Sequence, residues 1–265
     1  MEALNEAMIK AAVVDRLLRH HINGDAVLIS EMVLANGLRR ADLAVANGFL
    51  HAFEIKSDRD TLDRLDGQLE AYRAQFDKVT LVVATRFVES VLSKYPKHVE
   101  VWEALNDGAR VRIKLRRRGE CMPVRSAATL GGFLRKTDLA TFLRSEGVDV
   151  TAAAPRLNLM QELERVSVTR LRRFVLSTVK RRYKTQYDTF MAQRCEATLP
   201  VDLVALRRTE IGLARSVDQL KIAPAVTDTK SGQRLERAVN VNRLRERYGL
   251  VAENIPQTVL LRSAA

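Results

Sequence analysis

Aromatic residues and cysteines are scarce in this chain of 265 residues. Aromatic side chains make up 5% of it, with one Trp and five Tyr, which argues against an extensive platform for stacking nucleic-acid bases. The two cysteines, Cys121 and Cys195, stand alone, so the sequence has no CxxC pair and no disulfide framework. Because disulfide frameworks belong to oxidising compartments, we expect a cytoplasmic protein.

Long apolar runs are also absent. No stretch reaches the roughly 18 consecutive apolar residues that a membrane helix requires. The first 21 residues, MEALNEAMIKAAVVDRLLRHH, include acids and lack both the basic start and the unbroken apolar segment of a signal peptide. Their apolar residues recur at helical spacing, which predicts an amphipathic helix. We therefore expect no membrane partner.

Positive charge is concentrated in the second half of the chain. The formal net charge is +12. Residues 1–120 contain 19 Lys and Arg against 18 Asp and Glu, whereas residues 121–265 contain 25 against 14. An excess of this size in one half favours a polyanionic partner, most simply nucleic acid. A solvated, arginine-rich helical surface has the same composition and is the alternative interpretation.

The first half alternates between strand and helix patterns. Two apolar runs flank Asn47-Gly48, which is a strong hairpin signal. A helical stripe follows, with Ser57 as a plausible N-cap. The expected elements are a helix at 1–21, strands at 26–34, 40–46 and 49–56, a helix at 57–76, a strand at 78–85, a helix at 86–94, and strands at 99–105 and 110–118. This order predicts an α/β fold with an αβββαβ core and a mixed sheet.

Beyond about residue 121 the strand patterns give way to helical ones. We therefore expect a domain at 1–122 and a mostly helical, basic domain at 123–265. Residues 222–265 have a weaker pattern, and we expect them to be partly extended or mobile.

The charged residues of the hairpin point in different directions in its two possible registers. A two-residue loop at Asn47-Gly48 mixes charged and apolar side chains on both faces. A three-residue loop at 46–48, with Gly48 left-handed, pairs residue 45 with 49 and residue 42 with 52. Asp42, Glu54 and Lys56 then share one face. A one-residue slip turns every side chain to the other face, so the apolar pattern favours this second register.

Two carboxylates that lie close together repel each other unless a cation compensates them. Mg²⁺ is commonly held by one or two carboxylates, so Asp42 and Glu54 are candidate metal ligands. Lys56 points the same way and is placed to polarise an attacking water or to stabilise charge on a phosphate. An ion-paired cluster in which Lys56 bridges Asp42 and Glu54 is the structural alternative.

These residues resemble the motifs of the PD-(D/E)xK nuclease superfamily. Arg-Ala-Asp at 40–42 matches its first motif, although Ala41 replaces the proline, and Glu-Ile-Lys at 54–56 matches its second. Gln68 and Tyr72 match the QxxxY signature of the RecB-like branch, and Glu31 matches an additional upstream acid. The resemblance covers roughly residues 1–90.

The resemblance implies a restriction-endonuclease-like core and a Mg²⁺-dependent deoxyribonuclease, with Mn²⁺ as a substitute metal. Asp42 and Glu54 would hold the metal with help from Glu31, and Lys56 would assist the water. Gln68 and Tyr72 would support the site or the DNA. No iron–sulfur cluster is expected, because the four-cysteine pattern of some relatives is absent. A role in repair, phage defence or a mobile element is expected by the same resemblance.

Four arginines are candidate phosphate contacts. Arg64 lies one turn before Gln68 and is placed either to reach a phosphate or to pair with Asp60. Arg172, Arg173 and Arg181 belong to a basic helical segment with an apolar stripe, which would pack by the stripe and present its basic face. The rival functions are an inactive nuclease fold that binds DNA or regulates, and a protein that docks onto a partner.

Overall fold

The structure, a computed structural model, describes residues 3–22, 24–34, 39–108, 110–151, 153–207, 236–238 and 258–260. The chain divides into two compact units, Met1–Leu213 and Ala214–Ala265. In the second unit, β7 (Glu236–Ala238) and β8 (Thr258–Leu260) form an antiparallel pair. Among the described residues, no helix combines the length and the apolar character that crossing a membrane requires.

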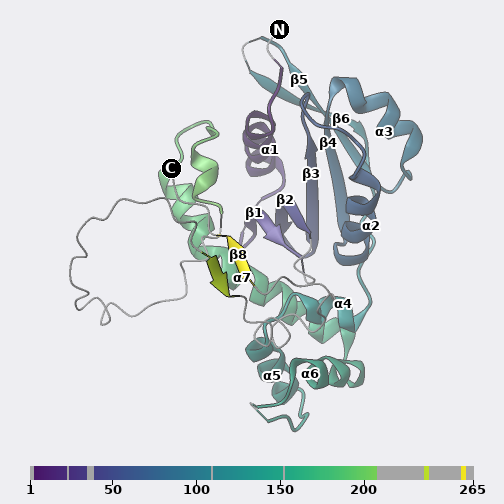
Figure 1. Cartoon of the computed structure of the whole chain (residues 1–265), viewed down its shortest axis with the longest axis vertical. Helices are drawn as coiled ribbons and strands as arrows, with labels where there is room; N and C mark the ends of the chain where they lie inside the picture. The colour runs from purple at the N-terminus through teal and green to yellow at the C-terminus, as the bar shows by residue number, and fades with distance from the viewer. Residues whose placement is uncertain are drawn as a thin grey trace, which may run out of the picture. The chain divides into compact units, whose positions relative to one another are not determined.

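The first unit follows the expected αβββαβ order (Figure 1). Its elements up to residue 117 are α1 (Glu6–His20), β1 (Val27–Val33), β2 (Arg40–Ala46), β3 (Leu50–Lys56), α2 (Leu65–Gln75), β4 (Lys78–Ala84), η1 (Thr85–Phe87), α3 (Val88–Lys94), β5 (Glu100–Asn106) and β6 (Val111–Arg117). The six strands form one sheet in chain order. The pairs β3–β4 and β4–β5 are parallel and the others antiparallel, so the α/β prediction with a mixed sheet is confirmed.

The two faces of the sheet have separate apolar cores. On one face, α1 packs over Leu43, Phe53 and Trp102, which are all buried. On the other face, α2 and α3 join the helices that follow the sheet, around residues such as Tyr72 and Leu81. Alternation along the strands explains this division, because successive side chains of a strand point to opposite faces.

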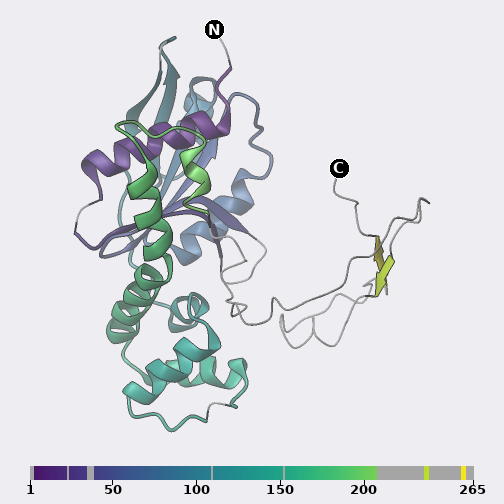
Figure 2. The same cartoon turned by 90° about the vertical axis from the view of Figure 1, so that its left-hand side faces the viewer.

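The helices that follow the sheet are α4 (Ala127–Gly132), α5 (Lys136–Ser145), α6 (Arg156–Glu162), η2 (Leu163–Arg165), α7 (Val168–Gln193) and η3 (Asp202–Val204). As Figure 2 shows, α7 runs from the helices α4–α6 to the sheet, where it contacts β1 and β2. Its stripe of Leu171, Val175 and Val179 is fully buried. By contacts the first unit extends to Leu213, and α4–α7 share one core with the sheet. The domain boundary expected at 122/123 stays a prediction.

The β2–β3 hairpin has the predicted loop length at a different position. Ala46 pairs with Leu50, so the three loop residues are 47–49 and not 46–48, and the register differs from the predicted one by two residues. An even shift leaves each side chain on its predicted face. Gly48 is left-handed, with φ +71, as expected. Asn47 donates a hydrogen bond of 2.8 Å to the His21 carbonyl, which ties the loop to the end of α1.

The prediction that Ser57 caps the second helix is wrong. Helix α2 begins at Leu65, and Ser57 instead closes a turn after β3, where its hydroxyl and its backbone N–H both donate to Asp60. Gly67 lies in the first turn of α2, and a Cβ at this position would come within 2.8 Å of Arg39 Nη2. Glycine therefore lets the Arg39 guanidinium lie against this helix.

Candidate functional site

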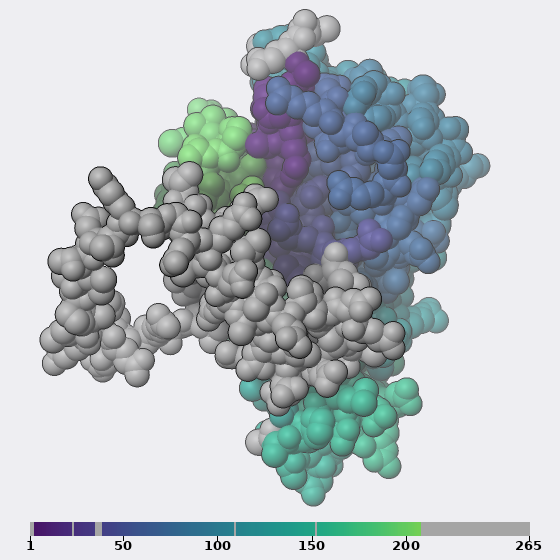
Figure 3. All heavy atoms as spheres, viewed as in Figure 1, coloured from purple at the N-terminus to yellow at the C-terminus, as the bar shows by residue number. Residues whose placement is uncertain are grey.

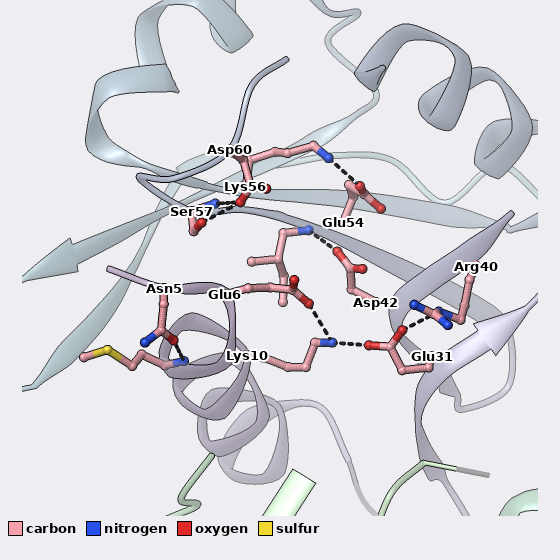
Figure 4. A network of polar contacts seen from close by, with 12 residues as sticks. Asn5, Glu6, Lys10, Glu31, Arg40, Asp42, Glu54, Lys56, Ser57 and Asp60 are labelled. Atoms are coloured by element: carbon pink, nitrogen blue, oxygen red, sulfur yellow. Dashed lines mark hydrogen bonds and ion pairs between the residues drawn. The ribbon is translucent and has the colours of Figure 1, made fainter. Parts of the chain in front are cut away.

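Three carboxylates lie in one row across β1, β2 and β3 (Figure 4). The register of β1 and β2 places Glu31 opposite Asp42. The register of β2 and β3, continued one step beyond its last pair, places Asp42 opposite Glu54. Glu31 has a left-handed backbone, with φ +58, a conformation that is uncommon for a residue with a side chain. The hairpin thus aligns the acids that the sequence singled out.

Glu54 is the most heavily bonded of these acids. Its Oε1 accepts hydrogen bonds from Lys56 Nζ at 2.8 Å and Gln68 Nε2 at 2.5 Å. Its Oε2 lies 2.7 Å from the Tyr72 hydroxyl, which is also 2.7 Å from the Arg40 carbonyl oxygen. Burial, and then the Glu54 charge, raises the pKa of Tyr72, so the hydroxyl stays a neutral donor. Gln68 and Tyr72 therefore hold a strand carboxylate from α2.

Lys56 is held beside Glu54. Its Nζ lies 2.8 Å from Glu54 Oε1 and 3.0 Å from Gln68 Oε1, and its side chain is 11% exposed. Within the described part of the chain it forms no ion pair with Asp42. The bridge from Lys56 to both carboxylates, which was the structural alternative, is therefore not the arrangement seen. The ammonium is fixed by an acid and an amide on one side of the site.

Asp42 lies where β2 and β3 cease to pair. Its Oδ2 accepts a hydrogen bond of 2.7 Å from the Ile55 backbone N–H. Burial, followed by the neighbouring Glu54 charge, raises the pKa of Asp42 to about 8. The carboxyl therefore binds its proton more tightly than an exposed aspartate does. A cation close to Asp42 would reverse this effect, because it favours the charged form.

The replacement Asp42→Asn should stabilise the metal-free protein at alkaline pH. The folded-state pKa lies above the ordinary 3.8, so the stability that this carboxyl contributes is fully present below about pH 4 and is lost as the pH rises through about 8. Asparagine keeps an acceptor for the Ile55 N–H without the charge. We expect a gain of about 1–3 kcal/mol at pH 8.5 that disappears near pH 4. Urea unfolding in EDTA across this range measures it, and a gain independent of pH would contradict it.

A second lysine, Lys10 of α1, lies on the opposite side of the acid row. Its side chain is 2% exposed, and its Nζ lies 3.0 Å from Glu6 and 2.5 Å from Glu31, which Arg40 also contacts. Burial lowers the pKa of Lys10, but the hydrogen bond to Glu31 and the charge of Asp42 outweigh it, so the pKa is raised. Lys10 is therefore a buried ammonium that partly neutralises the row.

The sequence analysis missed Glu6 and Lys10. They are four residues apart on α1, a spacing that predicts an ion pair on one helix face. The available signal was the position of Lys10 directly after Ile9 and before Ala11 and Val13, on the apolar side of the expected helix. A lysine at such a position needs a partner, and the partner is provided by β1.

The carboxylates offer a second candidate cation site beside the Asp42–Glu54 pair, which stays a prediction. Oxygen atoms of Glu6, Glu31 and Asp42 all lie within 4.8 Å of one another. Both oxygens of Glu54 already accept hydrogen bonds from Lys56, Gln68 and Tyr72, and both oxygens of Glu31 already pair with Lys10 and Arg40. Three carboxylates are hard oxygen donors of the kind that suits Mg²⁺ or Mn²⁺, so the residues fit the metal that the resemblance implies.

The predicted phosphate-binding arginines differ in their surroundings. Arg64 is exposed at the start of α2 and has no ion-pair partner among the described residues, since Asp60 bonds Ser57 instead. Arg173 is also exposed. Arg181 is 69% exposed and lies 4.0 Å from Asp138. These three side chains are available to a ligand.

Arg172, in contrast, is engaged within the fold. Its guanidinium forms two bonds to Asp77, of 2.7 and 2.6 Å, and also lies 3.3 Å from the Val124 carbonyl oxygen. The Asp77 carboxylate in turn accepts hydrogen bonds from the backbone N–H groups of Leu50 and Val124. Arg172 therefore joins α7 to the sheet and to the segment that leaves it.

The replacement Arg172→Ala should cost stability, whereas Arg173→Ala should cost DNA affinity. Removing Arg172 leaves the buried Asp77 without its charged partner, which we expect to lower the free energy of unfolding by about 2 kcal/mol. Arg173→Ala should change stability by less than about 0.5 kcal/mol and reduce the salt dependence of DNA binding by about one phosphate contact. Urea unfolding and fluorescence anisotropy with labelled duplex measure both. The reverse pattern would assign the phosphate contact to Arg172.

Comparison with known proteins places the chain in a phage family. The family described as Bacteriophage P4 protein cII matches residues 1–207. Protein cII of Enterobacteria phage P4 is 33% identical over 261 residues, which span 98% of this chain and 98% of that protein. Neither description states an activity, so the similarity to nucleases stays a prediction.

One solved structure is more distantly similar. A protein of unknown function from Silicibacter pomeroyi has a TM-score of 0.36 and 18% identity, and the match covers 56% of this chain and 99% of that one. A likeness of this degree supports no argument about fold or function. The family assignment therefore stands on the sequence matches, over 207 and 261 residues, which share one description. The chain belongs to the bacteriophage P4 protein cII family.

Proposed function

We propose that this protein is a Mg²⁺-dependent deoxyribonuclease that hydrolyses phosphodiester bonds in DNA. The observation that carries the proposal is the acid row, Glu31, Asp42 and Glu54, with the ammonium of Lys56 2.8 Å from Glu54. Gln68 and Tyr72 support the proposal because they hold Glu54 from the neighbouring helix. Carboxylates can hold a metal ion for phosphodiester hydrolysis, and a fixed ammonium can stabilise the charge that develops on the phosphate.

In this proposal, Glu6, Glu31 and Asp42 would hold the metal through their carboxylate oxygens. Bound Mg²⁺ would supply Lewis acidity toward a phosphate oxygen. Lys56 would hold the attacking water beside Glu54 and stabilise negative charge that develops on the phosphate.

DNA is proposed as the substrate because the chain carries a net charge of +12 and because Arg64, Arg173 and Arg181 are exposed. A basic surface of this kind binds phosphates with little regard to sequence, and its affinity falls with salt. The sequence similarity to protein cII of phage P4 supports a role on the DNA of a mobile genetic element or in phage defence.

Titration of Mg²⁺ or Mn²⁺ into the purified protein with labelled single- and double-stranded DNA tests the proposal. We expect metal-dependent cleavage by the wild type and its loss in Asp42→Ala, because one carboxylate of the row is gone. Asp149→Ala, which removes a carboxylate outside the row, is the control and should cleave like the wild type. Equal cleavage by Asp42→Ala and the wild type would refute the assignment.

A catalytically inactive DNA-binding or regulatory module is the second candidate, and Lys10 favours it. The ammonium already neutralises part of the acid row, with Nζ 2.5 Å from Glu31. Such a module would bind DNA equally well with Mg²⁺ and with EDTA and would cleave with neither. Binding that is insensitive to metal, without cleavage, would select this candidate.

A further inference from the structure

A groove of about 910 Å³ lies between α1, β6 and the segment that ends α7. Figure 3 shows this segment, in light green, beside the purple surface of α1. A hydrogen bond of 3.0 Å from Arg194 to Asp15 joins the two. The groove opens over the core that α1 covers, where Met8, Leu18 and Ile113 are only partly buried. These three residues therefore form an apolar floor that is accessible from the surface.

The groove is lined by more basic than acidic residues. Five arginines and two acids contribute a net charge of +3. The acid Asp15 already bonds Arg194 and the backbone and hydroxyl of Thr198. Arg19 and Arg112 are exposed and form no ion pair with any described residue. A ligand of this groove would therefore meet uncompensated positive charge above an apolar floor.

Arg16 adds a buried donor to the same groove. Its Nη1 donates to the Ile113 carbonyl at 3.0 Å, and its guanidinium lies 4.9 Å from the centre of the Trp102 ring. Its Nε is buried and has no hydrogen-bond partner within the described residues. The Ile113 carbonyl and the Trp102 ring thus hold the Arg16 guanidinium in this wall of the groove.

Exposed aliphatic side chains in and beside the groove favour a protein ligand over a nucleic acid. Met191, which lines the groove, is 40% exposed. Leu199 and Val201, on either side of the lining residue Pro200, are 55% and 70% exposed. A phosphate backbone gains nothing from aliphatic contacts, whereas protein interfaces combine an apolar centre with a polar rim.

We propose that this groove docks a segment of a partner protein that carries both acidic and apolar side chains. The apolar side chains of the segment cover the floor formed by Met8, Leu18 and Ile113, and its carboxylates meet Arg19 and Arg112. The proposal does not depend on nuclease activity, because none of these residues belongs to the acid row.

Fluorescence anisotropy of the full chain with a defined probe tests the proposal. The probe is a labelled 20-residue amphipathic peptide of Glu, Leu and Ala with one apolar face, and a scrambled peptide of the same composition reports charge alone. We expect the wild type to bind the amphipathic peptide at least about tenfold more tightly than the scrambled one, because only the former matches the floor.

Two variants of the groove should weaken binding of the amphipathic peptide. Arg19→Glu with Arg112→Glu reverses the charge of the rim and should reduce its affinity at least about tenfold. Ala12→Trp, at a partly buried position that lines the groove, should reduce it without a change in charge. Arg118→Glu with Arg125→Glu, at exposed positions outside the groove, is the matched control and should bind like the wild type. Circular dichroism verifies that each variant is folded.

Three results would overturn the proposal. The first is equal binding of the amphipathic and scrambled peptides by the wild type. The second is a loss of affinity for a 20-base-pair duplex in the Arg19/Arg112 variant with peptide binding unchanged, which would make the groove a nucleic-acid surface. The third is a dimer in sedimentation that this variant dissociates, which would make a second copy of the chain the occupant.

Discussion

Replacing Lys56 with alanine should lower the rate of metal-dependent DNA cleavage by about a thousandfold or more. The ammonium lies 2.8 Å from Glu54 and 3.0 Å from Gln68, and alanine would leave this position without its positive charge. DNA affinity should change by less than about threefold, since binding is spread over many exposed cations. Single-turnover cleavage, and binding measured in Ca²⁺, separate these two effects.

The matched control for this prediction is Lys94→Ala. Lys94 also pairs with an acid, Asp66, at 2.8 Å, but it is exposed and lies at the end of α3. Cleavage by this variant should equal that of the wild type. Full activity in Lys56→Ala would remove Lys56 from the proposed chemistry, while cleavage by the wild type would still support a metal site at the acid row.

Replacing Lys10 with methionine should destabilise the metal-free protein and make its stability depend on Mg²⁺. The change removes the buried ammonium from Glu31 and Glu6 and leaves their charges uncompensated. We expect a loss of about 3 kcal/mol, or roughly 10 °C in Tm. Millimolar Mg²⁺ should restore much of this loss, because a cation bound to the carboxylates stabilises only the folded state. Thermal unfolding with Mg²⁺ and with EDTA measures both effects.

Lys78→Met provides the comparison for Lys10→Met. Lys78 forms an ion pair with the buried Glu100, at 2.7 Å, on β4 and away from the acid row, and its side chain is 18% exposed against 2% for Lys10. It should lose a comparable amount of stability and recover none of it with Mg²⁺. If Mg²⁺ raises the Tm of neither variant, the carboxylates around Lys10 do not form a cation site, and Lys10 is only their structural partner.

The periodicity of the strands was sufficient to predict which residues of the hairpin share a face. Because the side-chain period is two, the two-residue difference in register left Asp42 and Glu54 on one face. The position of the loop was not predictable from the hairpin alone. The observed loop also bonds outside the hairpin, from Asn47 to the His21 carbonyl at the end of α1, and the hairpin sequence does not contain this contact.

The residues that the sequence analysis missed depend on contacts between distant segments. Lys10 is explained only by Glu31, which β1 brings to α1. The apolar stripe of α7 was visible as a pattern, but the pairing of Arg172 with Asp77, 95 residues away, was not. Local periodicity identifies the face that a helix buries. It does not distinguish the arginines that bind within the fold from those that stay in solvent.

The bonds to Glu54 join the sheet to α2 through a single carboxylate. Gln68 and Tyr72 reach it from successive turns of the helix, and Tyr72 is fully buried. A ligand that moves Glu54 must therefore also move α2 or break these two bonds. Backbone protection along 65–75 would therefore report a ligand that displaces Glu54, even where that ligand does not touch α2 itself.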